Sequence, residues 1–282
     1  MVLFGMSAFH YLTVCWFDGK PANWYGGKMA KTYVVTLRKG GCGKTTTAVN
    51  LATALKLKDK RVLLVDMDPQ ANATVSVGID PTSLKLNINT LFTSLDVDVD
   101  DVIVKTDFGL EVLPAHPDLA KTEAGMQATQ IGILKGILEP IEDRYDYIII
   151  DTPPSESYLS IAALTYGEYV IIPLQAHFLA MQALTQAIED VNHVKKGLNP
   201  KIKIRGILFT MVNFRTNIAK VVMEEIKNQY KDLVFPIEIS FSIKHVEATL
   251  AGVPIVLFDP KHQGSIAYKK LAELILNEEE KN

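Results

Sequence analysis

The sequence is poor in cysteine, with only Cys15 and Cys42 among its 282 residues. Two cysteines cannot build the disulfide framework that stabilises many small secreted proteins. Cys42 also lies inside a glycine-rich segment, residues 39–46, where a free thiol fits a reducing cytosol. With 48% hydrophobic residues, the chain is expected to be stabilised by a buried apolar core.

The sequence also lacks long apolar runs, internal repeats and low-complexity linkers. No stretch of 18 apolar residues is free of charge, so no membrane-spanning helix is expected. The acidic run 96–101 lacks the glycine and the terminal glutamate of a calcium loop, and we interpret it as a solvated edge. These absences leave a globular α/β protein as the working class.

The first 28 residues differ from the rest of the chain. They are apolar and aromatic, and they lack the basic start and small-residue cleavage site of a signal peptide. The chain changes character at Met29, shortly before the first expected strand. We therefore expect residues 1–28 to be a leader that is not translated in the native protein, and residues 29–282 to form one domain. The intact mass of the native protein tests this, because a species beginning at Met1 contradicts it.

Charge is distributed unevenly around a net value of −3. Residues 66–160 contain 17 acids and 5 bases, whereas residues 195–270 contain 13 bases and 6 acids. A basic C-terminal half can form a face for a polyanion, or it can be a set of solvated lysines on helix surfaces. Charge alone favours the second interpretation.

Apolar runs of strand length alternate with helical periodicities, which is typical of a parallel sheet covered by helices on both faces. The expected strands are 33–38, 61–66, 110–113, 146–151, 168–174 and 202–211. The expected helices are 44–57, 129–140, 157–164, 178–196, 215–230 and 264–278. Ligands of such sheets bind at the carboxyl ends of the strands.

A phosphate-binding loop follows the first expected strand. It comprises Lys39, Gly40, Gly41, Cys42, Gly43, Lys44, Thr45 and Thr46. Glycines let backbone N–H groups surround phosphate oxygens, and the following helix adds the positive end of its dipole. Lys44 can reach the terminal phosphates, and the Thr45 hydroxyl can ligate Mg²⁺. The general pattern has glycine where Arg38 stands, and Lys39 is an additional cation.

Acidic side chains follow two other expected strands. Asp66 and Asp68 end the strand 61–66, and Asp151 ends the strand 146–151. Carboxylates at the tips of buried strands need a cation or hydrogen-bond donors. Asp151 stands where a carboxylate can hold Mg²⁺ through water. A capping role for Asp68 in the following turn is the structural alternative.

These motifs resemble the deviant Walker A motif of the ParA/MinD ATPase superfamily, and the likeness runs from about Met29 to Leu276. The resemblance implies a single-domain P-loop NTPase that uses ATP and Mg²⁺. It further implies that Asp68 activates the attacking water, Asp66 supports the Mg²⁺ shell, and Gln70 and Asn72 respond to the nucleotide. In this family the extra lysine, here Lys39, reaches the nucleotide of a second subunit in an ATP-bound homodimer.

The C-terminal half carries a looser resemblance. Asn213 matches a position near adenine, although many relatives have Asp there. Arg215 and Lys244 match positions of non-specific DNA contact, but another basic position has become Phe241. Solvated surface charge remains the alternative for both basic residues.

The pattern is most similar to the short ParA/Soj-type segregation ATPases. It implies a cytoplasmic, nucleoid-associated enzyme for plasmid or chromosome partition. Its ATP-bound dimer binds DNA non-specifically, and a centromere-binding ParB-like partner stimulates slow hydrolysis. A MinD-like membrane switch or the positioning of another cargo stays open. The acidic C-terminus disfavours stable membrane association, and the lack of a cysteine ligand pair disfavours an iron–sulfur carrier.

Overall fold

The computed structural model describes residues 29–213 and 216–279. The expected leader, residues 1–28, and Arg215 lie outside the described residues. The strands are β1 (Lys31–Val35), β2 (Val62–Asp66), β3 (Val104–Lys105), β4 (Glu111–Leu113), β5 (Tyr147–Asp151), β6 (Tyr169–Gln175), β7 (Lys203–Val212) and β8 (Val234–Ser240). The α-helices are α1 (Lys44–Lys56), α2 (Asn72–Ser76), α3 (Ile88–Thr93), α4 (Val99–Val102), α5 (Leu119–Gly125), α6 (Ile133–Leu138), α7 (Tyr158–Tyr166), α8 (Ala180–Gly197), α9 (Asn217–Gln229), α10 (Lys244–Leu250), α11 (Ile255–Phe258) and α12 (Gln263–Glu279).

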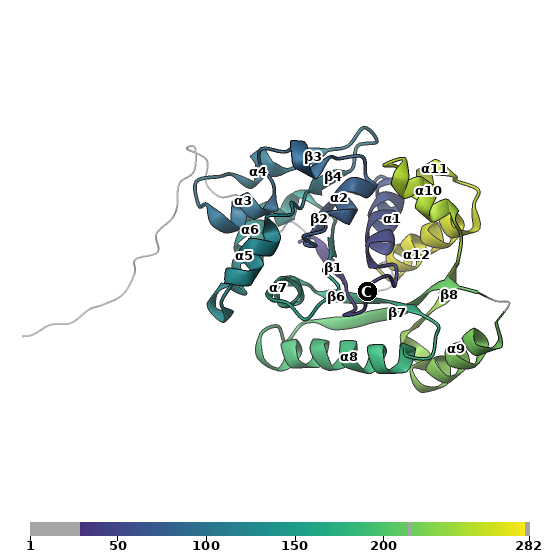
Figure 1. The fold of residues 1–282 in the computed structure, drawn as a ribbon. Coiled ribbons are helices and arrows are strands. Elements are labelled where there is room, and N and C mark those ends of the chain that lie inside the picture. Colours follow the sequence, from purple (N-terminus) through teal and green to yellow (C-terminus); the bar gives the residue numbers. More distant parts are fainter. Residues whose placement is uncertain (1–28, 214–215, 280–282) are drawn as a thin grey trace, which may run out of the picture.

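The described strands form one eight-stranded sheet in the order β3-β4-β2-β5-β1-β6-β7-β8 (Figure 1). All neighbouring pairs are parallel except β3 and β4, which pair antiparallel at one edge. The predicted α/β fold with a mostly parallel sheet is therefore confirmed. β1 lies between β5 and β6, so the segment after β1 opens at the centre of the sheet, where a crevice forms in such folds.

Both faces of the sheet are covered by helices, which explains the continuous apolar runs of the central strands. Along β1, Tyr33 and Val35 belong to the core on the side of α1 and α12, whereas Val34 belongs to the core on the other side. Figure 1 shows α1 and α12 on one side of the sheet and α7 and α8 on the other. No helix in the described ranges is long and apolar enough to cross a bilayer.

All six expected strands are present, but the edge strands β3 and β8 were not predicted. β3 has only two residues, and β8 contains Pro236, which a strand tolerates at an edge because one side needs no ladder hydrogen bond. The helix expected over 129–140 is reduced to α6 between 3₁₀ turns. Gly132 and Gly136 lower its helical propensity, and Pro140 cannot donate a helical hydrogen bond.

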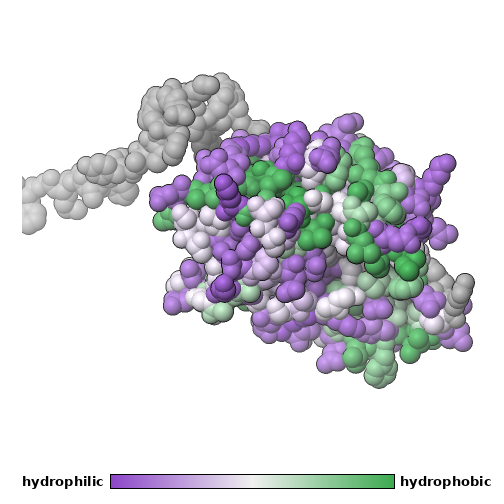
Figure 2. All heavy atoms as spheres, turned by 45° about the horizontal axis from the view of Figure 1, so that its top comes forward, coloured by the Kyte–Doolittle hydropathy of each residue, from purple (hydrophilic) through white to green (hydrophobic). Residues whose placement is uncertain are grey.

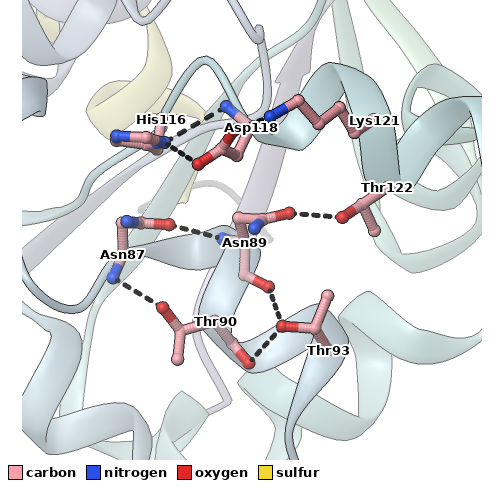
Figure 3. A network of polar contacts seen from close by, with 8 residues as sticks. All are labelled: Asn87, Asn89, Thr90, Thr93, His116, Asp118, Lys121 and Thr122. Carbon is pink, nitrogen blue, oxygen red and sulfur yellow. Dashed lines mark hydrogen bonds and ion pairs between the residues drawn. The ribbon is translucent and has the colours of Figure 1, made fainter.

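A polar network holds the segment after β4 against α3 and α5 (Figure 3). The Asn87 side chain caps α3 by accepting the Asn89 N–H at 3.0 Å, and Thr122 of α5 donates to the Asn89 side chain. Nearby, the Ala115 N–H donates to Thr74 Oγ1 at 3.0 Å. Because Thr74 also donates to Asp66, the segment after β4 is tied to the end of β2 beside the crevice.

Candidate functional site

The phosphate loop adopts the backbone conformation that its glycines permit. Gly41 and Gly43 have φ angles of 69° and 85°, a left-handed region that side chains with a Cβ rarely enter. Helix α1 begins at Lys44, directly after the second of these turns. Thr210 of β7 donates its hydroxyl to the Cys42 carbonyl at 2.7 Å, which fixes the loop to β7, two strands away from β1.

Two side chains of the loop donate to one carbonyl. Lys44, only 6% exposed, donates from Nζ to the Lys39 carbonyl at 3.1 Å, and Cys42 donates its thiol to the same oxygen at 3.1 Å. Burial raises the pKa of the Cys42 thiol, and the Lys44 charge only partly opposes this. Cys42 is therefore a protonated structural donor, and it is not poised as a nucleophile.

Two fully buried carboxylates stand side by side beneath the loop. Asp66 of β2 and Asp151 of β5 are register partners in adjacent parallel strands, so their side chains share a face of the sheet. Neither Asp151 oxygen accepts a hydrogen bond within the described part of the chain. Burial and the Asp66 charge raise the pKa of Asp151 well above its ordinary range, while nearby Thr45 and Lys44 act in the opposite direction. Such an orphaned carboxylate suits a cation ligand.

Asp66 differs from Asp151 because donors already surround it. Its Oδ2 accepts both the N–H and the hydroxyl of Thr74 at 2.8 Å, and its Oδ1 accepts the Asp68 N–H at 3.1 Å. Burial raises the pKa of Asp66 to about 6, against these hydrogen bonds. The structure thus places Asp66 where it shapes the turn after β2 and stands next to Asp151.

Asp68 faces the cleft above the loop. Its Oδ1 accepts the Gln70 N–H at 2.9 Å, which is the turn-capping contact considered from the sequence. Burial raises the pKa of Asp68, and the Gln70 N–H and the Lys44 charge lower it. The second oxygen of this carboxylate is not used in the cap, so the capping role does not exclude a catalytic one.

The cleft has a polar part and an apolar part that share Gly43, Thr46, Met211 and Thr249. The polar part, about 310 Å³, is lined by Gly40, Gly41, Gly43, Lys44, Thr45, Thr46, Asp68, Gln70, Asn72, Ser76, Pro154, Met211 and Thr249. The apolar part, about 210 Å³, is lined by Gly43, Thr46, Met211, Ile239, Ser240, Phe241, Ser242, His245, Val246 and Thr249. Met211, at the junction, has a positive φ of 50°, a strained conformation that is concentrated at functional sites.

Comparison with known proteins agrees with this geometry. A family model described as "AAA domain" matches residues 30–204. The sporulation initiation inhibitor protein Soj of Bacillus subtilis is 41% identical over 248 residues, which cover 87% of this chain and 98% of Soj. The chain belongs to the ParA/Soj family of partition ATPases.

Solved structures of similar proteins have the same fold as this ParA/Soj-family chain. A putative plasmid partition protein of Borrelia burgdorferi bound to AMPPNP is 29% identical, with a TM-score of 0.75 over 88% of this chain and 99% of that chain. Cobyrinic acid a,c-diamide synthase of Mycobacterium smegmatis, with bound ATP analog and magnesium, is 33% identical, with a TM-score of 0.77 over 88% of this chain and 94% of that chain. The same fold therefore occurs both in a plasmid partition protein and in a cobyrinic acid a,c-diamide synthase.

In this ParA/Soj-family chain, residues 40–46, Asp66, Asp68 and Asp151 meet at one site, as predicted. The Lys39 side chain turns instead to His177. Of the C-terminal predictions that the structure describes, Asn213 and Lys244 do not line the site. Asn213 is exposed just after β7 and does not line the apolar cleft. Lys244, at the start of α10, is 44% exposed and forms a 2.6 Å ion pair with Glu247. Phe241 is 70% exposed at the cleft rim. The adenine and DNA roles remain predictions.

Sequence reasoning missed a clamp around Arg38. Arg38 Nε donates to Asp190 Oδ2 at 2.6 Å, and the guanidinium also contacts Asp190 Oδ1 and Glu156. The clamp joins the root of the phosphate loop, the loop after β5 and helix α8. The sequence did mark this position, because Arg38 stands where the general motif has glycine. The two acidic partners of Arg38 are more than 100 positions away, so the sequence could not pair them.

His245, also missed, supplies a pH prediction. Both ring nitrogens are buried and have no hydrogen-bond partner among the residues that the structure describes, and the ring packs edge-on against His262 and Tyr268. Burial, with His262 adding to it, lowers the pKa of His245 to about 4. Between pH 6.5 and 4 the unfolded chain therefore binds a proton that the folded chain does not, so this residue makes stability fall as pH decreases.

We expect His245→Leu to lose less thermal stability than the parent chain between pH 7 and pH 5, as measured by Tm at each pH. Taking the difference between variants cancels the titration of all other groups. His193→Leu, a substitution at an exposed histidine of α8, is the control. Equal losses of Tm in the parent chain and His245→Leu would contradict the role of His245.

Proposed function

We propose that this chain is the ATPase of a DNA-partition system, acting on a plasmid or a chromosome. The observation that carries the proposal is the convergence of Lys44, Asp68 and Asp151 around the glycine loop that follows Lys39, in a chain that spans 98% of Soj. ATP hydrolysis to ADP and phosphate would supply the cycle. Magnesium and ATP analogs in the structures of relatives support these cofactors.

The site fits a nucleotide with magnesium. Backbone N–H groups of residues 40–46 and the start of α1 would surround the phosphates, and Lys44 would turn to them. Thr45 and Asp151 would hold Mg²⁺, with Asp66 supporting that shell, because the Asp151 oxygens are buried and unpartnered. When bound, Mg²⁺ neutralises phosphate charge. The apolar part of the cleft would receive the base, and Asn213 would approach it from the rim.

Catalysis would depend on two further groups. Asp68 would orient the attacking water with the oxygen that does not cap Gln70. Lys39 would reach the nucleotide of a second protomer and stabilise the charge that develops in transfer. Hydrolysis would therefore be slow in isolated protomers and faster in an ATP-bound homodimer.

The ATP-bound dimer would bind DNA through phosphate contacts, with Arg215 and Lys244 among the contacting residues. A ParB-like protein at a centromere-like site would stimulate hydrolysis and release the dimer. This cycle would place the protein in the cytoplasm on the nucleoid. Helix α12 disfavours a membrane as the target, because its residues Leu271, Ala272 and Ile275 pack into the core and are not available to enter lipid.

The test is DNA binding with ATP, with ADP and without nucleotide, at two salt concentrations. We expect binding that needs ATP and weakens steeply with salt. Arg215→Ala and Lys244→Ala should each weaken it and lower the salt slope by about one. Lys58→Ala, on a surface pair with Glu273, is the matched control. Equal binding in all nucleotide states, or none, would contradict the proposed cycle.

A further inference from the structure

Helix α8 and the turn before it contact two consecutive residues of the phosphate loop. Lys39 Nζ contacts His177 Nε2, in the turn that leads into α8. Arg38, the preceding residue, is held by both oxygens of Asp190 further along the same helix. The Arg38 clamp restrains the chain next to Lys39, and the His177 contact holds the Lys39 ammonium. Both the base and the tip of the Lys39 side chain are therefore restrained.

We propose that His177 is a positioning residue that keeps Lys39 within its own protomer, and that this contact must break before Lys39 can serve a second one. The inference rests on the proposed function of Lys39 and adds a regulatory step to it. While Lys39 contacts His177, its ammonium is directed to its own α8 turn, so the contact opposes the active dimer.

The hydrogen bonds of His177 explain why the contact can be exchanged. His177 Nδ1 accepts the Leu179 N–H at 2.9 Å. A neutral imidazole has one acceptor nitrogen, so it can accept from Leu179 or from Lys39 but not from both. Burial and the Lys39 charge lower the pKa of His177, which keeps the ring neutral and able to accept. When Lys39 leaves, His177 Nδ1 can accept the Leu179 N–H without competition. This hydrogen bond offsets part of the free energy that is lost with the Lys39 contact.

Lys44 couples this release to nucleotide. Its ammonium donates to the Lys39 carbonyl at 3.1 Å and so restrains the main chain of Lys39. A phosphate group in the loop competes for Lys44, because a hydrogen bond between two charged groups is stronger than one to a neutral carbonyl. Once Lys44 turns to phosphate, Lys39 loses this restraint. ATP binding thus frees Lys39 at the moment when a second nucleotide-bound protomer can use it.

The experiment compares His177→Ala, His177→Gln, Lys39→Gln and the double variant Lys39→Gln/His177→Ala. Self-association with ATP is measured by analytical ultracentrifugation in an Asp68→Asn background, which slows turnover. ATPase is measured with Asp68 intact, as a function of protein concentration. His177→Ala should tighten the ATP-dependent dimer about 2- to 10-fold, the range for one net hydrogen bond. Half-maximal ATPase should shift to lower protein concentration by the same factor, with the maximal rate unchanged.

Two comparisons separate positioning from a structural role. His177→Gln should behave like the parent chain, because its carbonyl oxygen can still accept from Lys39. In the Lys39→Gln background, His177→Ala should have no further effect, because the contact is already gone. His193→Ala, on the exposed side of α8, should match the parent chain.

The outcomes distinguish the inference from the proposed function. If Lys39→Gln keeps the parent turnover, the proposed role of Lys39 is wrong, and the inference fails with it. If Lys39→Gln is inactive but His177→Ala leaves dimer affinity unchanged or weakens it, only the inference is overturned. An unchanged Tm of His177→Ala confirms that the comparison uses folded protein.

Discussion

Replacing Asp68 by asparagine should lower ATP turnover by about 10²- to 10⁴-fold, the range for loss of a positioned general base. Asparagine keeps the volume and can still accept the Gln70 N–H, so the turn after β2 should persist. It cannot take a proton from the attacking water. ATP affinity, measured by equilibrium binding of a fluorescent analog, should change only a few-fold, because the loop and Lys44 are untouched.

Asp80→Asn is the matched control for this experiment. Asp80 Oδ1 accepts the Thr82 N–H at 2.9 Å, the same local contact that Asp68 makes with Gln70, but it lies on the surface away from the cleft. Turnover of Asp80→Asn should equal that of the parent chain. If Asp68→Asn hydrolyses ATP at the parent rate, Asp68 is a turn cap only, and the catalytic assignment is wrong.

Replacing Asp151 by asparagine should have opposite effects on stability and on function. The parent carboxyl is fully buried and accepts no hydrogen bond within the described ranges, and burial raises its pKa, so ionising it at pH 7 destabilises the fold. The neutral variant should gain about 0.5–2 kcal/mol in the free energy of unfolding without ligand. It should also lose the stabilisation that Mg²⁺ and ATP together give the parent chain.

The sign of the Asp151 effect can be checked at the other end of the same strand. Asp146 precedes β5 and pairs with Arg61 at 2.9 Å, and that hydrogen-bonded pair lowers its pKa. Asp146→Asn should therefore destabilise the protein slightly and leave the response to Mg²⁺ and ATP intact. Denaturant unfolding at pH 7, with and without Mg²⁺ and ATP, measures both variants. A loss of stability in Asp151→Asn without ligand would contradict the account of an unpartnered charge.

The site was predictable where its residues are close in sequence. The spacing of Gly41, Gly43, Lys44 and Thr45 fixes a loop whose shape depends on local backbone freedom and on the helix that follows. Asp66 and Asp151 were predictable for a related reason. Each ends a strand of a parallel sheet, and parallel strands bring their carboxyl ends to one edge.

The apolar part of the cleft was predicted less well from the sequence than the polar part. The apolar part depends on β7, β8 and α10, and β8 was missed because its proline and short apolar run resemble a loop. Asn213 matched a family pattern, yet it lies outside that cleft. His245 gave no signal in the sequence, because a buried unpartnered histidine and an exposed one have the same letter and similar neighbours.

The sequence by itself determined the α/β class, the order of the central elements and the phosphate loop, because periodicity and glycine placement act over a few residues. Only the tertiary structure decided which groups pair across the fold. Arg38 meets Asp190, Lys39 meets His177, and the Asp151 carboxylate accepts no hydrogen bond from the residues that the structure describes. These contacts depend on how β5 lies beside β1 and how α8 packs on β6 and β7. Packing is set by the whole core, so no local pattern encodes them.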